Sequence, residues 1–146
     1  MQIEIRIDSA YAEPKLIVLT AQMTDELREM LKSWSQETQV ISGSRNETIE
    51  LIDPESIVRV YAAAGKVFAV TEEGEFMLRQ RLYEMEARLD PRRFVRISNS
   101  ELINLKKVKG FDLNFVGTIC VRLTDGTTTY VSRRYVPKIK KLLGMR

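Results

Sequence analysis

The sequence predicts an α+β fold that is mainly β, over 146 residues. Short segments with alternating apolar and polar residues, bounded by Gly, Pro, Asn and Asp, outnumber the segments with helical spacing. Apolar residues make up 44% of the chain, which is enough for a packed core. The length fits one domain with a short structured extension.

Residues 1–45 are predicted to form a β-α-β extension, followed by a domain over residues 46–146. Met23–Trp34 has apolar residues at helical spacing, and Thr24 is a candidate N-cap. The turn-forming residues 42–46 mark the boundary. Strands of the extension are predicted at Gln2–Asp8, Lys15–Thr20 and Gln39–Ser42.

The second part of the chain is predicted to consist mostly of strands. Strands are expected at Glu47–Asp53, Ile57–Ala62, Val67–Thr71, Phe94–Ile97, Leu105–Val108, Phe115–Leu123 and Thr127–Val131. Ala63–Lys66 joins two of them as a hairpin. Helices are expected at Met77–Leu89 and from about Arg134 to Leu143. The segment Asn99–Asn104 mixes polar and apolar residues and has no assignment.

Charge is divided unevenly along the chain. Residues 1–90 hold 10 basic and 17 acidic residues, a net charge of −7, whereas residues 91–146 hold 13 basic and three acidic residues, a net charge of +10. Nucleic acid is the usual partner of such a basic segment, because each neutralised phosphate releases counterions. A solvated basic face is the alternative that composition leaves open.

Several function classes are not expected from this sequence. The chain has no histidine and one cysteine, Cys120, which excludes a zinc site of the Cys/His type and every Ser-His or Cys-His nucleophile pair. We find no Gly-rich phosphate loop and no convincing carboxylate pair, so we expect no enzyme, metal site, cofactor or small-molecule substrate. No apolar run approaches the ~20 residues of a membrane span and no signal peptide is evident, which favours a cytoplasmic protein.

Two basic segments have residue types suited to DNA. Arg92, Arg93 and Arg96 lead into Ser98-Asn99-Ser100, where the arginines suit phosphates and Asn99 suits the donor and acceptor edge of adenine. Asn99 could instead cap a turn. Ser132–Tyr135 lies where the last strand passes into the last helix.

At that junction Arg134 suits the O6/N7 edge of guanine, although Arg133 and Arg134 could also form a solvated helix start. Lys66, at the hairpin tip, is a third candidate reader of bases, with plain solubility as its alternative. Lys138 and Lys141 lie on the polar face of the last helix. The candidate phosphate contacts are Arg92, Arg93, Arg96, Ser98, Ser100, Arg133, Lys138 and Lys141.

Residues 47–146 resemble the LytTR DNA-binding domain family. The resemblance rests on Phe94–Leu105, which has the pattern Phe, x, Arg, a polar pair, Ser and an apolar-apolar-Asn ending. The helix predicted before it and Val131–Val136 support the match. The resemblance implies an elongated β-sheet domain of about ten strands whose loops enter successive major grooves of an operator with repeats. It implies base contacts by Asn99 and Arg134 and, more loosely, by Lys66.

The resemblance also bears on regulation and partners. Many members carry a receiver domain, which about 45 residues cannot form, so aspartate phosphorylation is not the expected switch. Similar small members are often controlled by a membrane-protein inhibitor, so residues 1–45 are expected to serve dimerisation or regulation. Alternatively, the helix simply packs on its own strands. We therefore expect a sequence-specific transcription regulator that binds double-stranded DNA as a homodimer. A module that binds an acidic or membrane-associated protein partner is the alternative.

Overall fold

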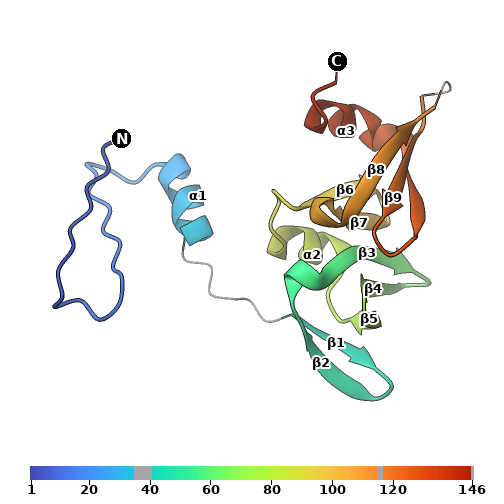
Figure 1. The fold of residues 1–146 in the computed structure, drawn as a ribbon, viewed down its shortest axis with the longest axis horizontal. Coiled ribbons are helices and arrows are strands. Elements are labelled where there is room, and N and C mark those ends of the chain that lie inside the picture. Colours follow the sequence, from blue (N-terminus) through green and yellow to red (C-terminus); the bar gives the residue numbers. More distant parts are fainter. Residues whose placement is uncertain (35–40, 115–116, 146) are drawn as a thin grey trace. The chain divides into compact units, whose positions relative to one another are not determined.

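The computed structural model describes residues 1–34, 41–114 and 117–145. The chain divides into two compact units, residues 1–37 and 38–146 (Figure 1). Within the described ranges the first unit holds one helix and the second holds ten strands and two helices. The prediction of a mainly β α+β protein is confirmed. No helix of the described residues is long and apolar enough to cross a membrane.

The first unit is built around α1 (Asp25–Trp34). Thr24 caps it as predicted, because its Oγ1 accepts a hydrogen bond from the Leu27 amide at 3.2 Å. The predicted strands Gln2–Asp8 and Lys15–Thr20 are wrong for this chain, since neither segment is paired with another strand. Alternation supplies one apolar face, but a stable strand also needs a neighbouring strand and a cover for that face. The predicted β-α-β extension is therefore corrected to a helix with extended segments.

The second unit begins with a hairpin of β1 (Ile41–Arg45) and β2 (Thr48–Ile52). Its turn lies at Asn46 and Glu47, which both adopt positive φ angles, of 51° and 63°. The boundary predicted at residues 45 and 46 thus falls within a hairpin of the second unit. Of the strand predicted at Gln39–Ser42, residues 39 and 40 lie outside the described residues and the other two belong to β1.

The main sheet has seven antiparallel strands in the order β2-β1-β5-β4-β3-β7-β6. Its further strands are β3 (Ile57–Ala63), β4 (Lys66–Thr71), β5 (Gly74–Leu78), β6 (Phe94–Ser98) and β7 (Glu101–Asn104). A second antiparallel sheet has the order β10-β9-β8. Its strands are β8 (Val108–Leu113), β9 (Ile119–Leu123) and β10 (Thr128–Val131).

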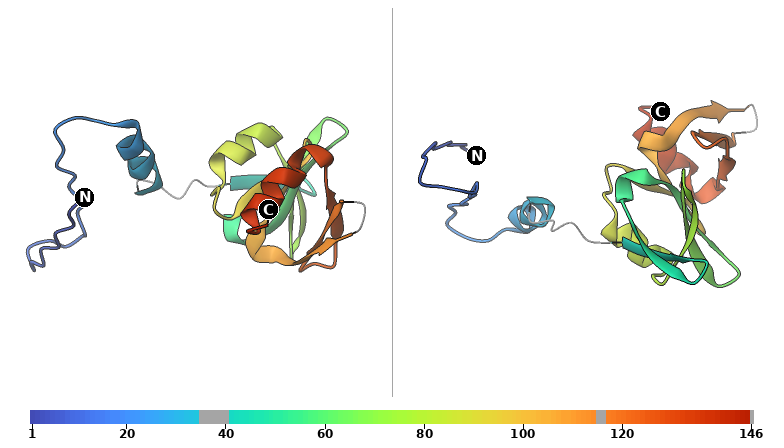
Figure 2. Two further views of the ribbon diagram at one scale, coloured as in Figure 1. Left: turned by 90° about the horizontal axis from the view of Figure 1, so that it is seen from above. Right: turned by 60° about the horizontal axis from the view of Figure 1, so that its bottom comes forward.

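Helical segments connect these strands. The α-helices of the second unit are α2 (Leu82–Arg88) and α3 (Val136–Leu142). Short 3-10 helices lie at η1 (Pro54–Ser56), η2 (Leu105–Lys107) and η3 (Arg133–Tyr135). Figures 1 and 2 show α2 on one side of β6 and β7, with α3 and the second sheet on the other side.

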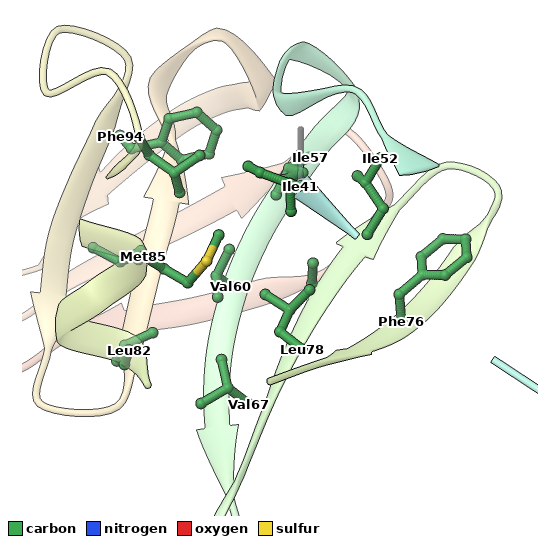
Figure 3. Close-up of a cluster of buried hydrophobic side chains, with 13 residues drawn as sticks. Ile41, Ile52, Ile57, Val60, Val67, Phe76, Leu78, Leu82, Met85 and Phe94 are labelled. Atoms are coloured by element: carbon green, nitrogen blue, oxygen red, sulfur yellow. The ribbon is translucent and has the colours of Figure 1, made fainter. Parts of the chain in front are cut away.

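The main sheet has a hydrophobic core on one face, and its strands β3, β6 and β7 contribute to a second core on the other face. The first core includes Leu82 and Met85 of α2 together with residues of β1 to β7 (Figure 3). The second core contains Val95 and Ile97 of β6, side chains of β9 and β10, and Ile139 of α3. The registers of β3 with β4 and of β6 with β7 each shift by one residue, as at a β-bulge. Because successive side chains of a strand point to opposite faces of the sheet, β3 and β6 supply side chains to both cores.

Further predicted elements differ from the structure. Of the strand predicted at Phe115–Leu123, residues 115 and 116 lie outside the described residues, and β9 begins at Ile119. The helix predicted at Met77–Leu89 begins only at Leu82, because Leu78 pairs with Val67 in the sheet. Leu78 at the end of β5 and Leu82 at the start of α2 both belong to the first core. Their helix-like spacing therefore reflects burial in the same core and not a continuous helix. The strand predicted at Leu105–Val108 is η2 and the first residue of β8.

Candidate nucleic-acid interface

The register of the main sheet brings two predicted loops to the same end. β3 pairs antiparallel with β7, and Tyr61 lies opposite Glu101. The turn after β3 and the turn before β7 therefore adjoin each other. A backbone hydrogen bond from the Ala62 amide to the Ser100 carbonyl, 2.8 Å long, ties them together. We call this end of the sheet the reader end. It consists of the β3–β4 turn (residues 64–65), the β6–β7 turn (residues 99–100) and η3.

Lys66 is the first residue of β4 and is exposed at the reader end. The turn before it consists of Ala64 and Gly65, both with positive φ (51° and 76°), as in a tight two-residue hairpin. Because Val67 lies opposite Leu78, the exposed Arg79 follows β5 at the same end. Sequence reasoning missed Arg79, since only the strand pairing brings it beside Lys66.

Asn99 lies in the two-residue turn between β6 and β7 and is exposed. Ser98 stabilises this turn, because its Oγ accepts a hydrogen bond from the Ser100 amide at 3.2 Å. The Oγ atoms of Ser98 and Ser100 lie 3.3 Å apart. Ser98 is half-buried and Ser100 is exposed.

Arg96 stabilises the Asn99 turn through hydrogen bonds to two of its backbone carbonyls. Its Nε donates to the Ser98 carbonyl at 2.7 Å and its Nη2 donates to the Asn99 carbonyl. Its Nη1 donates to Glu86 Oε2 of α2 at 2.6 Å. The side chain is only 16% exposed. Three of its five guanidinium N–H groups thus donate to protein acceptors, and its predicted role as a phosphate contact stays a prediction.

The third reader segment is η3, which joins β10 to α3. A backbone hydrogen bond from the Ser132 amide to the Ile97 carbonyl, 2.9 Å long, fixes η3 against the end of β6. The Tyr135 hydroxyl donates to Asn99 Oδ1 at 3.3 Å. Arg134 is exposed, and its guanidinium lies 5.9 Å from the centre of the Tyr135 ring. Tyr135 therefore connects the two strongest predicted readers.

A buried ion pair lies directly behind the Asn99 turn. Arg59 Nη1 donates to Glu101 Oε2 at 2.6 Å, and the two side chains are 22% and 8% exposed. Thr129 of β10 donates to Glu101 Oε1. Glu101 therefore joins the main sheet to the second sheet next to the reader turn. The Arg59 guanidinium also lies 4.4 Å from the centre of the Tyr61 ring.

Tyr61 belongs to the same face of β3. Its hydroxyl hydrogen-bonds to Glu75 of β5, and this bond, together with burial, raises the pKa of Tyr61 above its usual value. The tyrosine therefore stays neutral at physiological pH. Its ring stacks on Phe68 with the ring centres 5.3 Å apart. This face thus carries stacked aromatic rings and an ion pair next to the reader end.

Arg92 and Arg93 lie at the other end of β6. That strand rises about 3.3 Å per residue, which separates Arg93 from Asn99 by roughly 15–20 Å. Arg92 pairs with Asp90 at 3.2 Å, and Arg93 pairs with Glu55 at 2.6 Å. The backbone amide of Arg92 also donates to Asp90 and lowers the pKa of that carboxyl below its usual value. We call this end of β6, with the ion pairs Arg92–Asp90 and Arg93–Glu55, the paired end.

The remaining predicted cations lie near the C-terminal helix. Lys138 and Lys141 are exposed on α3, opposite Ile139, which is buried in the second core. Arg133 is exposed in η3. Within residues 1–34, 41–114 and 117–145, no carboxylate forms an ion pair with Lys66, Arg79 or Arg134. The reader end therefore presents cations whose charge is not neutralised by a neighbouring side chain.

These features define a class: a β-sheet DNA-binding domain with cations and a polar reader gathered at one sheet end. Comparison with known proteins agrees. The LytTr DNA-binding domain family model matches residues 47–144. The chain therefore belongs to the LytTR family, and the resemblance predicted from Phe94–Leu105 is confirmed.

Individual relatives support the same class. Proteins of Staphylococcus aureus strains MSSA476 and NCTC 8325, described as HTH-type transcriptional regulators, are each 28% identical over 147 residues, with 99% of both chains covered. A solved LytTr DNA-binding domain of a methyl-accepting/DNA response regulator from Bacillus cereus has a TM-score of 0.71 at 21% identity, covering 75% of this chain and all of that one. The chain thus contains a LytTr DNA-binding domain, and the relatives that match it over their full length are described as transcriptional regulators.

The label HTH-type in those names does not describe this fold. In the described part of the chain, α1 and α2 are separated by five strands, and α2 and α3 by five more. A helix-turn-helix needs two helices joined by a short turn.

Proposed function

We propose that the protein is a sequence-specific transcription regulator that reads bases with Lys66, Asn99 and Arg134. The observation that supports this proposal is the meeting of three segments, distant in sequence, at the reader end. The two turns and η3 are joined by the backbone hydrogen bonds Ala62–Ser100 and Ser132–Ile97. Narrow turns projecting from a sheet edge suit the major groove of B-DNA, which is about 12 Å wide.

Each reader is assigned a base by its hydrogen-bonding groups. Asn99 offers an amide donor and acceptor to adenine, and its Oδ1 retains a lone pair beside the Tyr135 hydrogen bond. Arg134 suits the O6/N7 edge of guanine, and Lys66 can donate to the same acceptors. Arg79, Ser100, Arg133, Lys138 and Lys141 are proposed as phosphate contacts.

Arg96 is proposed as a positioning residue because it fixes the Asn99 turn through two carbonyl oxygens. We further propose that two copies bind a repeat-containing operator, with the reader end of each copy in successive major grooves. Two copies on one duplex raise the apparent affinity and set the spacing of the half-sites.

The experiment first selects bound duplexes from a randomised DNA library, and then measures affinity for the selected and for scrambled duplexes by fluorescence anisotropy. We expect Asn99→Ala and Arg134→Ala each to lose about 1–3 kcal/mol of discrimination. Arg92→Ala, at the paired end, is the control and should leave discrimination unchanged. Equal weakening on selected and scrambled duplexes would show that both residues contact only the DNA backbone.

A further inference from the structure

The side-chain amide of Asn99 is contacted by a residue that is distant in sequence. The Tyr135 hydroxyl of η3 donates to Asn99 Oδ1 at 3.3 Å, across 36 positions of the chain. Among the described residues, Tyr135 is the only one that hydrogen-bonds to this amide. The backbone of Asn99 is held separately, because Arg96 Nη2 donates to its carbonyl. The Tyr135 hydroxyl therefore acts on the group that is assigned to the base and not on the backbone of the turn.

Tyr135 is itself anchored to the domain. Its side chain is half-buried and packs against the second core, which restricts its torsions. Its backbone amide donates to the Ser132 carbonyl at 2.9 Å, and the Ser132 amide donates to the Ile97 carbonyl at 2.9 Å. The hydroxyl is therefore presented to Asn99 from a position that the core and the end of β6 define.

Restraint of the Asn99 amide bears directly on selectivity. Bidentate reading of adenine needs the amide oxygen to accept from the N6 amino group while the amide nitrogen donates to N7. An exposed side chain that rotates freely offers this pair only part of the time, and the lost rotation reduces affinity on binding. The Tyr135 hydroxyl occupies one lone pair of Oδ1 and leaves the other for the base.

The ring of Tyr135 lies beside the second assigned reader. The Arg134 guanidinium is 5.9 Å from the centre of this ring, which is within the range of a cation–π contact. Arg134 is otherwise exposed at the surface of η3. The hydroxyl and the ring of one tyrosine thus contact different readers, so substitutions can remove the two contacts separately.

We propose that Tyr135 is a positioning residue for base recognition, with its hydroxyl restraining the Asn99 amide and its ring restraining the Arg134 guanidinium. This inference rests on the proposed function, because it concerns how the two assigned readers are held. The base preferences of both readers then depend on a single aromatic side chain that acts through them.

Two variants of the full chain separate the two contacts. Tyr135→Phe removes the hydroxyl and keeps the ring, whereas Tyr135→Leu removes both. Affinity is measured for the selected duplex and for duplexes with one base pair changed, at the positions that Asn99→Ala and Arg134→Ala identify. Tyr135→Phe should reduce discrimination about 2- to 10-fold at the Asn99 position only, because one hydrogen bond is lost. Tyr135→Leu should also reduce it about 2- to 5-fold at the Arg134 position.

The controls separate positioning from a general effect on the domain. Tyr83→Phe, at an exposed tyrosine of α2, should leave both base preferences unchanged. The slope of log affinity against log salt should be the same in all these variants, because no cation is removed. Equal losses at both positions in Tyr135→Phe would show a general distortion of the reader end and would overturn the proposal. Full discrimination in Tyr135→Phe would overturn it as well, and that variant retains the packing of the ring.

A measurement without DNA distinguishes failure of this inference from failure of the proposed function. Nitrogen-15 relaxation reports the order parameter of the Asn99 side-chain amide, which should be lower in Tyr135→Phe than in the unmodified chain. Equal order parameters would refute the positioning role even where Asn99→Ala loses discrimination. A lower order parameter in Tyr135→Phe, together with full discrimination in Asn99→Ala, would instead refute the base contact assigned to Asn99.

Discussion

The two ends of the main sheet both carry arginines next to β6, yet the arginines differ in what surrounds them. At the paired end, Arg92 and Arg93 each form an ion pair with a carboxylate. At the reader end, Arg134 and Lys66 form no ion pair within the described residues, whereas the arginines that are paired, Arg59 and Arg96, are mostly buried next to the Asn99 turn. Position relative to the sheet therefore matters more than the number of arginines, because only unneutralised cations attract phosphate strongly.

The largest expected effect compares two Arg–Glu pairs of equal length. Glu101→Gln leaves the buried Arg59 without its carboxylate, and Arg59 Nε already lacks a partner. We expect about 2–3 kcal/mol of lost unfolding free energy, below the about 3–5 kcal/mol of a fully buried pair because Arg59 is partly exposed. Urea denaturation measures the difference.

Glu55→Gln is the matched control, because Glu55 Oε1 also lies 2.6 Å from an arginine Nη1 but its side chain is 67% exposed. We expect a loss below about 0.5 kcal/mol there. Similar losses for the two variants would show that burial does not distinguish the two ends.

The second comparison concerns the phosphate contacts. Arg133→Gln should weaken binding to all duplexes by about 1.5–2 kcal/mol, because a charge-assisted hydrogen bond is lost. The slope of log affinity against log salt should fall by about 0.9. Arg93→Gln should leave this slope unchanged, since Glu55 already neutralises Arg93. A reduced slope for Arg93→Gln would extend the DNA contact to the paired end.

The third comparison separates positioning from phosphate contact at Arg96. Arg96→Lys retains the charge but cannot donate to Glu86 and to both turn carbonyls at once. We expect about 1 kcal/mol less discrimination between selected and scrambled duplexes, because the Asn99 turn loses its support. The salt slope should not change. Unchanged discrimination would mean that Ser98 and the sheet fix the turn without Arg96.

Glu86→Gln provides the companion measurement, since Glu86 contacts Arg96 but is far from the bases in this assignment. It should reduce discrimination in the same direction and by less than Arg96→Lys. An effect only on overall affinity would argue against the positioning role.

The smallest expected effect concerns the paired end and depends on pH. The Asp90 carboxylate accepts a hydrogen bond from the Arg92 amide, which lowers its pKa in the folded chain below the usual value of an aspartate. The stability that Asp90 contributes is therefore present above the unfolded pKa and is lost as pH falls through the folded pKa. Asp90→Asn should cost less than about 1 kcal/mol at pH 7. Thermal unfolding at pH 7 and near pH 3 should show this cost shrinking at the lower pH, and an equal cost at both would contradict the prediction.

Much of the β domain could be predicted from sequence because its signals are local. The hairpin of β3 and β4 has alternating apolar residues and a turn with Gly65, and the structure confirms it. The helix predicted at residues 77–89 is too long, because Leu78 of a strand and Leu82 of a helix are buried in the same core. The strands predicted in the first unit failed because alternation does not provide a neighbouring strand.

The candidate site was predictable only as separate residues. The types and positions of Asn99 and Arg134 singled them out, whereas their proximity depends on strand register and on the hydrogen bond through Tyr135. The sequence suggested a phosphate contact for Arg96. Its actual acceptors, backbone carbonyls and a carboxylate of α2, could not be recognised from the neighbouring residues. Likewise, Glu55 neutralises Arg93 across 38 positions of sequence.

The supports of the reader end are mainly backbone atoms. The bonds from Ala62 to Ser100 and from Ser132 to Ile97 join amides to carbonyls, so they persist whatever side chains occupy positions 99 and 134. Under the proposed assignment of Asn99 and Arg134 as base contacts, single substitutions at those positions are expected to alter operator preference while the scaffold stays folded. In such a domain, a change of DNA target during evolution or in the laboratory requires substitutions at only a few solvent-exposed residues.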